Sequence, residues 1–175
     1  MLPLSMKTQQ AIGSPLVKQI TVLLAEDHAS FRKSLKVLVQ SEGDIKVVGE
    51  AKNGHEAVRL TVSLHPEIVV MDIALPLFNG LQATQQIMDI SPATKVLILS
   101  SHSGPEYIEQ AMILGASGYL IKQSSTQFLA EALRAVIQGK SYFSESISKA
   151  LSGQCRKIFR KGEALKAKAA RLAAA

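Results

Sequence analysis

The chain has 175 residues, 47% of them hydrophobic, which is enough for one domain with a core that needs neither disulfides nor a structural metal. Its single cysteine, Cys155, excludes an intramolecular disulfide and the zinc sites that need several cysteines. The net charge of +6 lies entirely in residues 151–175, because the first 150 residues hold equal numbers of basic and acidic side chains. Net attraction of the main domain to nucleic acid is therefore excluded.

The opening residues predict a poorly ordered lead-in over residues 1–19. Pro3, Gly13 and Pro15 interrupt this stretch, and no period is sustained in it. It lacks the basic and apolar regions of a secretory signal. The chain also has no apolar stretch near the roughly 18 residues that a membrane helix needs. We therefore expect a cytoplasmic protein with no membrane partner.

From Ile20 onward, short apolar runs alternate with amphipathic stretches. Runs rich in Val, Ile and Leu predict central parallel strands, covered on both faces, at 20–25, 45–51, 67–72, 95–100 and 117–121. The amphipathic stretches predict helices at 28–41, 54–64, 81–90, 106–114 and 126–138. Five strands alternating with five helices predict a three-layer α/β sandwich with right-handed crossovers.

The predicted domain covers residues 20–148, and residues 149–175 differ from it in kind. This basic tail is rich in Ala and Lys, prone to form a helix, and has few apolar side chains to bury. We interpret it as a linker or solvated tail, and its last residues could be vector-derived. Residual affinity for a DNA backbone is the alternative interpretation.

Polar side chains stand at the carboxyl ends of four predicted strands. Glu26 and Asp27 follow the first strand, Asp72 ends the third, Ser100 ends the fourth, and Lys122 follows the fifth. In open parallel sheets, ligands bind outside these ends, near the point where the strand order reverses. If the sheet has the flavodoxin-like order 2-1-3-4-5, the five side chains converge on one rim.

Three carboxylates on one rim require a counter-charge. At about 4 Å and an effective dielectric constant near 20, each pair costs roughly 4 kcal/mol. Oxygen ligands with room for water favour Mg²⁺ over zinc. Lys122 would then supply a point charge and Ser100 a hydroxyl donor to a phosphoryl group. Asp72 is the candidate nucleophile, since a carboxylate can form an acyl phosphate.

Four ordered motifs resemble the receiver domains of bacterial two-component response regulators. They are "LLAEDH", "VVMDIALPLFNG", "VLILSS" and "GASGYLIK", with 28 residues from Asp72 to Ser100 and 22 from Ser100 to Lys122. The resemblance covers about Ile20 to Ser148 and implies the CheY-like form of the flavodoxin-like fold. It also implies that a sensor histidine kinase is the phosphodonor.

The resemblance implies a role for each matching residue. Asp72 corresponds to the phosphoacceptor, Lys122 to the lysine that pairs with the phosphate, and Ser100 to the switch hydroxyl. Tyr119 corresponds to the aromatic residue whose inward turn reports phosphorylation on a surface used for dimerisation. The implied Mg²⁺ ligands are Glu26 (through water), Asp27, Asp72 and the backbone carbonyl of Ala74.

The stretch from Gly118 to Ser148 resembles, more narrowly, the NarL/FixJ subfamily with its C-terminal LuxR-type helix-turn-helix. After Ser148 only 27 residues remain, too few for such a domain. We therefore expect an excised receiver that regulates transcription, and binds DNA, only through the missing module. A natural stand-alone phosphorelay receiver is the alternative.

Three other functions compete with this interpretation. A haloacid-dehalogenase-like phosphatase would need a second acid two residues after the nucleophile, where this chain has Ala74. A flavodoxin-type flavin binder would need a hydroxyl- and glycine-rich loop where this chain reads "AEDHAS". A pseudo-receiver that only mediates contacts stays open, although Asp27, Asp72 and Lys122 are all present. His28 and His102 lie near the predicted site and could tune it.

Overall fold

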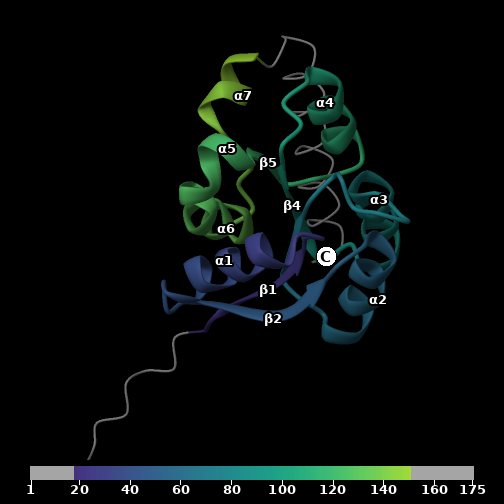
Figure 1. The fold of residues 1–175 in the computed structure, drawn as a ribbon, viewed down its shortest axis with the longest axis vertical. Helices are drawn as coiled ribbons and strands as arrows, with labels where there is room; N and C mark the ends of the chain where they lie inside the picture. The colour runs from purple at the N-terminus through teal and green to yellow at the C-terminus, as the bar shows by residue number, and fades with distance from the viewer. Residues whose placement is uncertain (1–17, 151–175) are drawn as a thin grey trace, which may run out of the picture.

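The structure, a computed structural model, describes residues 18–150 and shows a three-layer α/β sandwich (Figure 1). One sheet of parallel strands has the order β2-β1-β3-β4-β5-β6. The strands are β1 (Ile20–Ala25), β2 (Ile45–Ala51), β3 (Ile68–Met71), β4 (Lys95–Ser100), β5 (Gly118–Ile121) and β6 (Tyr142–Phe143). The helices are α1 (Ala29–Gln40), α2 (Gly54–Leu64), α3 (Gly80–Ile90), α4 (Pro105–Ile113), α5 (Lys122–Ser125), η1 (Thr126–Phe128, a 3-10 turn), α6 (Leu129–Ile137) and α7 (Glu145–Ala150).

Helices cover both faces of the sheet and form two apolar cores. In Figure 1, α2, α3 and α4 lie on one side of the sheet, and α1 and α6 on the other. Successive residues of β1 enter opposite cores: Leu23 belongs to the core under α2, α3 and α4, whereas Val22 and Leu24 belong to the core under α1 and α6. Because both of their faces are buried, the central strands β3, β4 and β5 are apolar without alternation, whereas the edge strand β2 is mostly only partly buried and contains Lys46 and Glu50.

The predicted strand order is confirmed, but the prediction of five strands was wrong by one. The additional strand, β6, pairs in parallel with β5, Tyr142 opposite Gly118 and Phe143 opposite Tyr119. Two residues are too few to show a hydrophobic period in the sequence. This strand forms because β5 offers it an edge, which no local pattern reports.

The last predicted helix is divided in the structure. Instead of one helix over 126–138, the chain forms the short α5 directly after β5, then η1, then α6. The Thr126 hydroxyl donates a hydrogen bond to the Lys122 carbonyl (2.6 Å) across this irregular stretch. Helix α7, after β6, was not predicted. The other four predicted helices agree with α1 to α4 within one residue at each end.

The predicted lead-in (1–19) and basic tail (149–175) lie almost entirely outside the described residues, so both boundaries stay predictions. Within residues 18–150, no helix is both long enough and apolar enough to cross a membrane.

Candidate functional site

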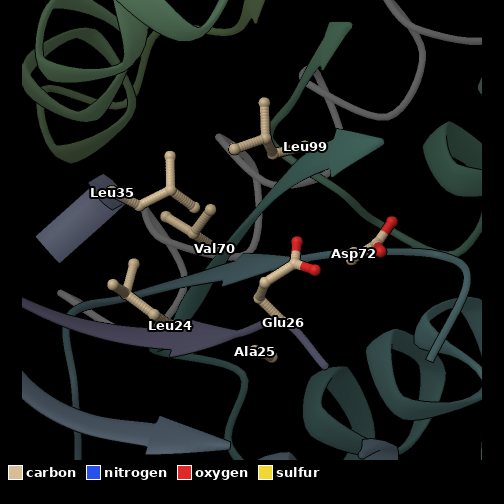
Figure 2. A pocket seen from close by; sticks show the side chains of 7 residues that line it. All are labelled: Leu24, Ala25, Glu26, Leu35, Val70, Asp72 and Leu99. Carbon is tan, nitrogen blue, oxygen red and sulfur yellow. The ribbon is translucent and has the colours of Figure 1, made fainter. Parts of the chain in front are cut away.

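The carboxylates of Glu26 and Asp72 lie beside each other at the carboxyl ends of adjacent strands (Figure 2). Backbone hydrogen bonds place them there. The Glu26 N–H donates to Ala51 O (3.0 Å) and the Asp72 N–H donates to Ala25 O (3.0 Å), so the sheet continues one residue past β1 and β3. Both acidic residues are buried. Apolar side chains line the same narrow hollow: Leu24, Leu35, Val70 and Leu99.

The ammonium group of Lys122 lies between these two carboxylates. Its Nζ is 2.8 Å from Asp72 Oδ2 and 2.6 Å from Glu26 Oε2. Lys122 follows β5 directly, so three strand ends contribute to one charged cluster. The positive charge offsets the repulsion between two buried carboxylates.

Lys122 keeps its proton at neutral pH. Burial lowers the pKa of Lys122, but the hydrogen bonds to Asp72 and Glu26 raise it more, and the net pKa lies above its ordinary value. The Nζ atom also lies 5.0 Å from the centre of the Phe31 ring, a cation–π arrangement contributed by α1. The side chain is therefore a fixed point charge that an anion could share.

Asp27 contributes a carboxylate oxygen that lacks a donor. Within the described part of the chain, its Oδ1 is buried and accepts no hydrogen bond. His28 Nδ1 lies 2.9 Å from this oxygen without hydrogen-bond geometry, and the same nitrogen is hydrogen-bonded to Glu26 Oε1 (3.1 Å). A buried carboxylate oxygen without a donor is costly unless a proton or a cation compensates it.

The ligand atoms at this site fit a hard divalent cation. One ligand atom from each of Glu26, Asp27 and His28 lies within 4.8 Å of the others. Carboxylate oxygens that leave room for water are what Mg²⁺ prefers, and the orphaned Asp27 Oδ1 is the atom that gains most from it. Asp72 is joined to this group through Lys122. Ala74, whose carbonyl was the last predicted ligand, donates its N–H to Asp72 Oδ1 (3.3 Å).

The loop between β3 and α3 packs against the backbone of Asp72. The Gly80 N–H donates to Ile73 O (3.0 Å), and a Cβ atom at position 80 would overlap the backbone oxygen of Asp72. Asn79 begins α3 with a capping box, since its side chain accepts from the Gln82 N–H while the Gln82 side chain accepts from the Asn79 N–H. The start of α3 is thus packed directly against the backbone of Asp72.

Ser100 and Tyr119 are connected through the loop that follows β4. The Ser100 hydroxyl oxygen accepts a hydrogen bond from the His102 N–H (3.3 Å), and the Tyr119 hydroxyl donates to the His102 carbonyl (2.7 Å). Tyr119 is completely buried, so its ring is turned inward. Burial raises the pKa of the Tyr119 hydroxyl well above its ordinary value, and the group remains a neutral donor.

A groove of about 380 Å³ opens beside this loop, between α3 and α4. Ala74 and His102, two residues beyond Asp72 and Ser100 respectively, both line it. The His102 ring stacks on Tyr107 of α4, with 4.4 Å between ring centres. The groove exposes these two positions to solvent next to the charged cluster.

Sequence reasoning missed two residues that support the site from α1. Arg32 is buried and donates to Glu26 O (2.6 Å) and to Glu50 Oε2 (3.0 Å). Phe31 lies under the Lys122 charge. Both occupy the first turn of the helix that follows Asp27. That position was the available signal, because the turn after a strand-end acid returns to the same rim.

Comparisons with known proteins point to one family. Residues 22–134 match the family model described as "Response regulator receiver domain". The chain is 32% identical over 145 residues to the transcriptional regulatory protein DegU of Brevibacillus brevis, covering 83% of this chain and 61% of that protein. It is 32% identical over 136 residues to the nitrate/nitrite response regulator protein NarL of Escherichia coli K12, covering 78% and 63%.

A solved structure that shares the fold is covered over almost its whole length. The crystal structure of a two-component response regulator of the LuxR family from Aurantimonas sp. SI85-9A1 superposes with a TM-score of 0.73 at 34% identity, covering 75% of this chain and 94% of that one. The chain spans only about three fifths of the length of DegU and NarL. The family match, the relatives and the strand-end cluster lead to one conclusion: this chain belongs to the response regulator receiver domain family, among relatives of the NarL/LuxR type.

Proposed function

We propose that Asp72 accepts a phosphoryl group from a phosphohistidine of a sensor histidine kinase. The observation that carries this proposal is the position of Lys122, whose ammonium group neutralises Asp72 Oδ2 from 2.8 Å. Oδ1 accepts the longer hydrogen bond from the Ala74 N–H (3.3 Å) and is the less neutralised oxygen. Oδ1 attacks the phosphorus, the P–N bond breaks, and the imidazole leaves with the electron pair and takes up a proton from solvent.

The surrounding residues stabilise charge on the transferred group. The Lys122 ammonium pairs with one phosphoryl oxygen, and the Ser100 hydroxyl, whose oxygen keeps accepting the His102 N–H, turns to donate to another. Mg²⁺ would be held by Asp27, Asp72, the Ala74 carbonyl and, through water, Glu26, and would supply positive charge for the remaining oxygen. The domain is thus a signalling phosphoacceptor, and loss of the phosphoryl group would use the same residues.

The output of the switch follows from its attachment to Ser100. When Ser100 turns toward the phosphoryl group, the loop at His102 moves with it. Tyr119 responds to this movement because its hydroxyl is hydrogen-bonded to the His102 carbonyl. We propose that this change promotes a homodimer in the cytoplasm. In a longer protein like its transcriptional relatives, the dimer would control DNA binding by a C-terminal domain. A stand-alone phosphorelay receiver would use the same chemistry without that output.

Intact-mass spectrometry after incubation with Mg²⁺ and acetyl phosphate tests the proposal. We expect a gain of one phosphoryl group, lost when Asp72→Asn replaces the nucleophile or when EDTA removes the metal. Asp89→Asn is the matched control, since Asp89 lies on α3 away from the strand ends, and it should be phosphorylated like the wild type. If the wild type gains no mass under these conditions, the domain is a pseudo-receiver and the proposal fails.

A further inference from the structure

We propose that β6 and α7, residues 142–150, form a latch on the edge of β5 whose docking is coupled to the phosphoryl site through Tyr119. The backbone carries the first part of this connection. The Ser144 N–H donates to the Tyr119 carbonyl (3.2 Å), and the Tyr142 N–H donates to the Ser117 carbonyl (3.3 Å). Phe143 is the register partner of Tyr119. The latch is therefore paired with the residue proposed to report phosphorylation.

Side chains of the latch are buried in the same core as the Tyr119 ring. Ile147 of α7 is 2% exposed and belongs to the apolar cluster that contains Tyr119 and, from α4, Ile108 and Met112. Phe143 packs against this cluster. Tyr119 is 0% exposed with the latch in place, so an outward turn of its ring requires the surrounding packing, including the latch, to open.

The other end of Tyr119 is attached to the phosphoryl site. Its hydroxyl donates to the His102 carbonyl, and the His102 N–H donates to Ser100. The buried side chain of Tyr119 thus contacts the loop that follows Ser100, while the backbone of Tyr119 is hydrogen-bonded to the latch. Tyr119 therefore joins the Ser100–His102 loop to the latch, through hydrogen bonds at its two ends and through the apolar cluster that it shares with Ile147.

Gly118 shows that the sequence accommodates the latch at this edge. A Cβ atom at position 118 would overlap the backbone oxygen of Tyr142 and crowd the Leu97 side chain. The backbone of β6 can lie this close to β5 only because residue 118 has no side chain.

The latch is also small enough to be released. It consists of a strand of two residues and a helix of six, and so short a helix depends on its packing to exist. Segments of this size open at a small cost in free energy compared with unfolding of the domain.

The sign of the coupling rests on the proposed function. A phosphoryl group that draws Ser100 inward favours the inward Tyr119, and the docked latch favours the same conformation. Because coupling between two sites is reciprocal, the phosphoryl group must tighten the latch, and loss of the latch must weaken binding of the phosphoryl group.

Hydrogen exchange of the full chain, with and without Mg²⁺ and beryllofluoride as a phosphoryl mimic, tests this coupling. We expect beryllofluoride to slow exchange in the loop 72–80 and, by at least about fivefold, in residues 142–150. Gly118→Ala and Ile147→Asp should each abolish the slowing in 142–150 and weaken beryllofluoride binding by about fivefold or more. Tyr119→Phe should still bind beryllofluoride but no longer protect residues 142–150.

A matched control distinguishes the latch from general surface change. Ile113→Asp introduces the same substitution at an α4 position that is 62% exposed, and it should behave like the wild type in both measurements. Slower exchange in 72–80 with no change in 142–150 would overturn the latch and leave the proposed function intact. No change in either segment would overturn the proposed function and the latch with it.

Discussion

The strained residue nearest the site is Leu77, in the loop that follows Asp72. Its φ of 67° lies in the left-handed region, and its side chain is 86% exposed. A leucine in this conformation has an unfavourable contact between its Cβ and the backbone and gains nothing from burial. The loop that carries the proposed nucleophile, Asp72, therefore holds local strain that a different residue would release.

Leu77→Asn should raise the free energy of unfolding by about 1 kcal/mol, because asparagine adopts the left-handed conformation more readily. Urea titration followed by circular dichroism measures the change. Val37→Asn, at an exposed α1 position with helical backbone, is the control and should bring no gain. Equal or lower stability of Leu77→Asn would contradict the assignment of backbone strain to this position.

Lys122 carries the electrostatic balance of the site. Lys122→Gln leaves Glu26 and Asp72 buried without their cation, so we expect a loss of about 3 kcal/mol in the free energy of unfolding. Added Mg²⁺ should restore part of this loss, and should raise the melting temperature of the variant more than that of the wild type. A variant as stable as the wild type without Mg²⁺ would contradict the assignment of Lys122 as the internal counter-ion.

Among the elements, α3 determines where Asp72 can lie, because Gly80 at its start touches the Asp72 backbone. Gly80→Ala should therefore lower stability by about 2 kcal/mol and slow phosphorylation, since a backbone shift at residue 72 misplaces the nucleophile. Gly104→Ala is the matched control, because the three atoms nearest to a Cβ there belong to the flexible Glu106 side chain. Normal phosphorylation of Gly80→Ala would contradict the inference that α3 determines the position of Asp72.

Helix α6 is tied to the turn between α1 and β2 by a charged cluster. Arg134 donates to both carboxylate oxygens of Asp44 (2.8 Å each) and to Glu42 (2.7 Å). The hydrogen bond from Arg134 lowers the pKa of Asp44 below its ordinary 3.8, against a smaller opposing effect of burial. A carboxyl whose pKa is lowered by folding stabilises the protein above its unfolded pKa, and that contribution is lost as the pH falls through the folded value.

Arg134→Gln should therefore be less stable than the wild type at pH 7, by at most about 1 kcal/mol, because solvent screens these partly exposed groups. The difference should disappear below the folded pKa of Asp44, which lies under 3.8. Thermal melts of both proteins from pH 7 to pH 2 measure it. Arg59→Gln, which removes an exposed 3.8 Å pair with Glu56, is the control and should show no difference. A constant deficit across the whole range would mean that Arg134 acts through packing.

For the whole molecule, elements with dense local signals were predictable from the sequence. The strands at 20–25 and 95–100 were predicted with their observed bounds, because continuous Val, Ile and Leu runs reflect burial on both faces. The edge strand at 45–51 was also predicted with its observed bounds, although most of its residues are only partly buried. The division of the helical segment after β5 and the pair β6–α7 were not predictable from the sequence. They depend on the β5 edge, on Gly118 and on the burial of Ile147, which are contacts between distant segments that no local period records.

The same division applies to the site. The predicted strand ends identified the candidate site residues, because topology alone brings such ends to one rim. These residues are Glu26, Asp27, Asp72, Ser100 and Lys122. The directions of the side chains could not be predicted from the sequence, because they follow from packing in three dimensions. Examples are the ion pair of Lys122 with Glu26, the position of His28 against Asp27, and the inward ring of Tyr119.

The central claim is that Asp72 is the nucleophile of this charged cluster, and reductive trapping tests it most directly. Borohydride converts an aspartyl phosphate to homoserine, so the phosphorylated chain can be reduced, digested and mapped by tandem mass spectrometry. The account predicts homoserine at position 72 in the presence of Mg²⁺ and a phosphodonor, and none without the metal. Homoserine at position 27 instead, or at no acidic position, would contradict it.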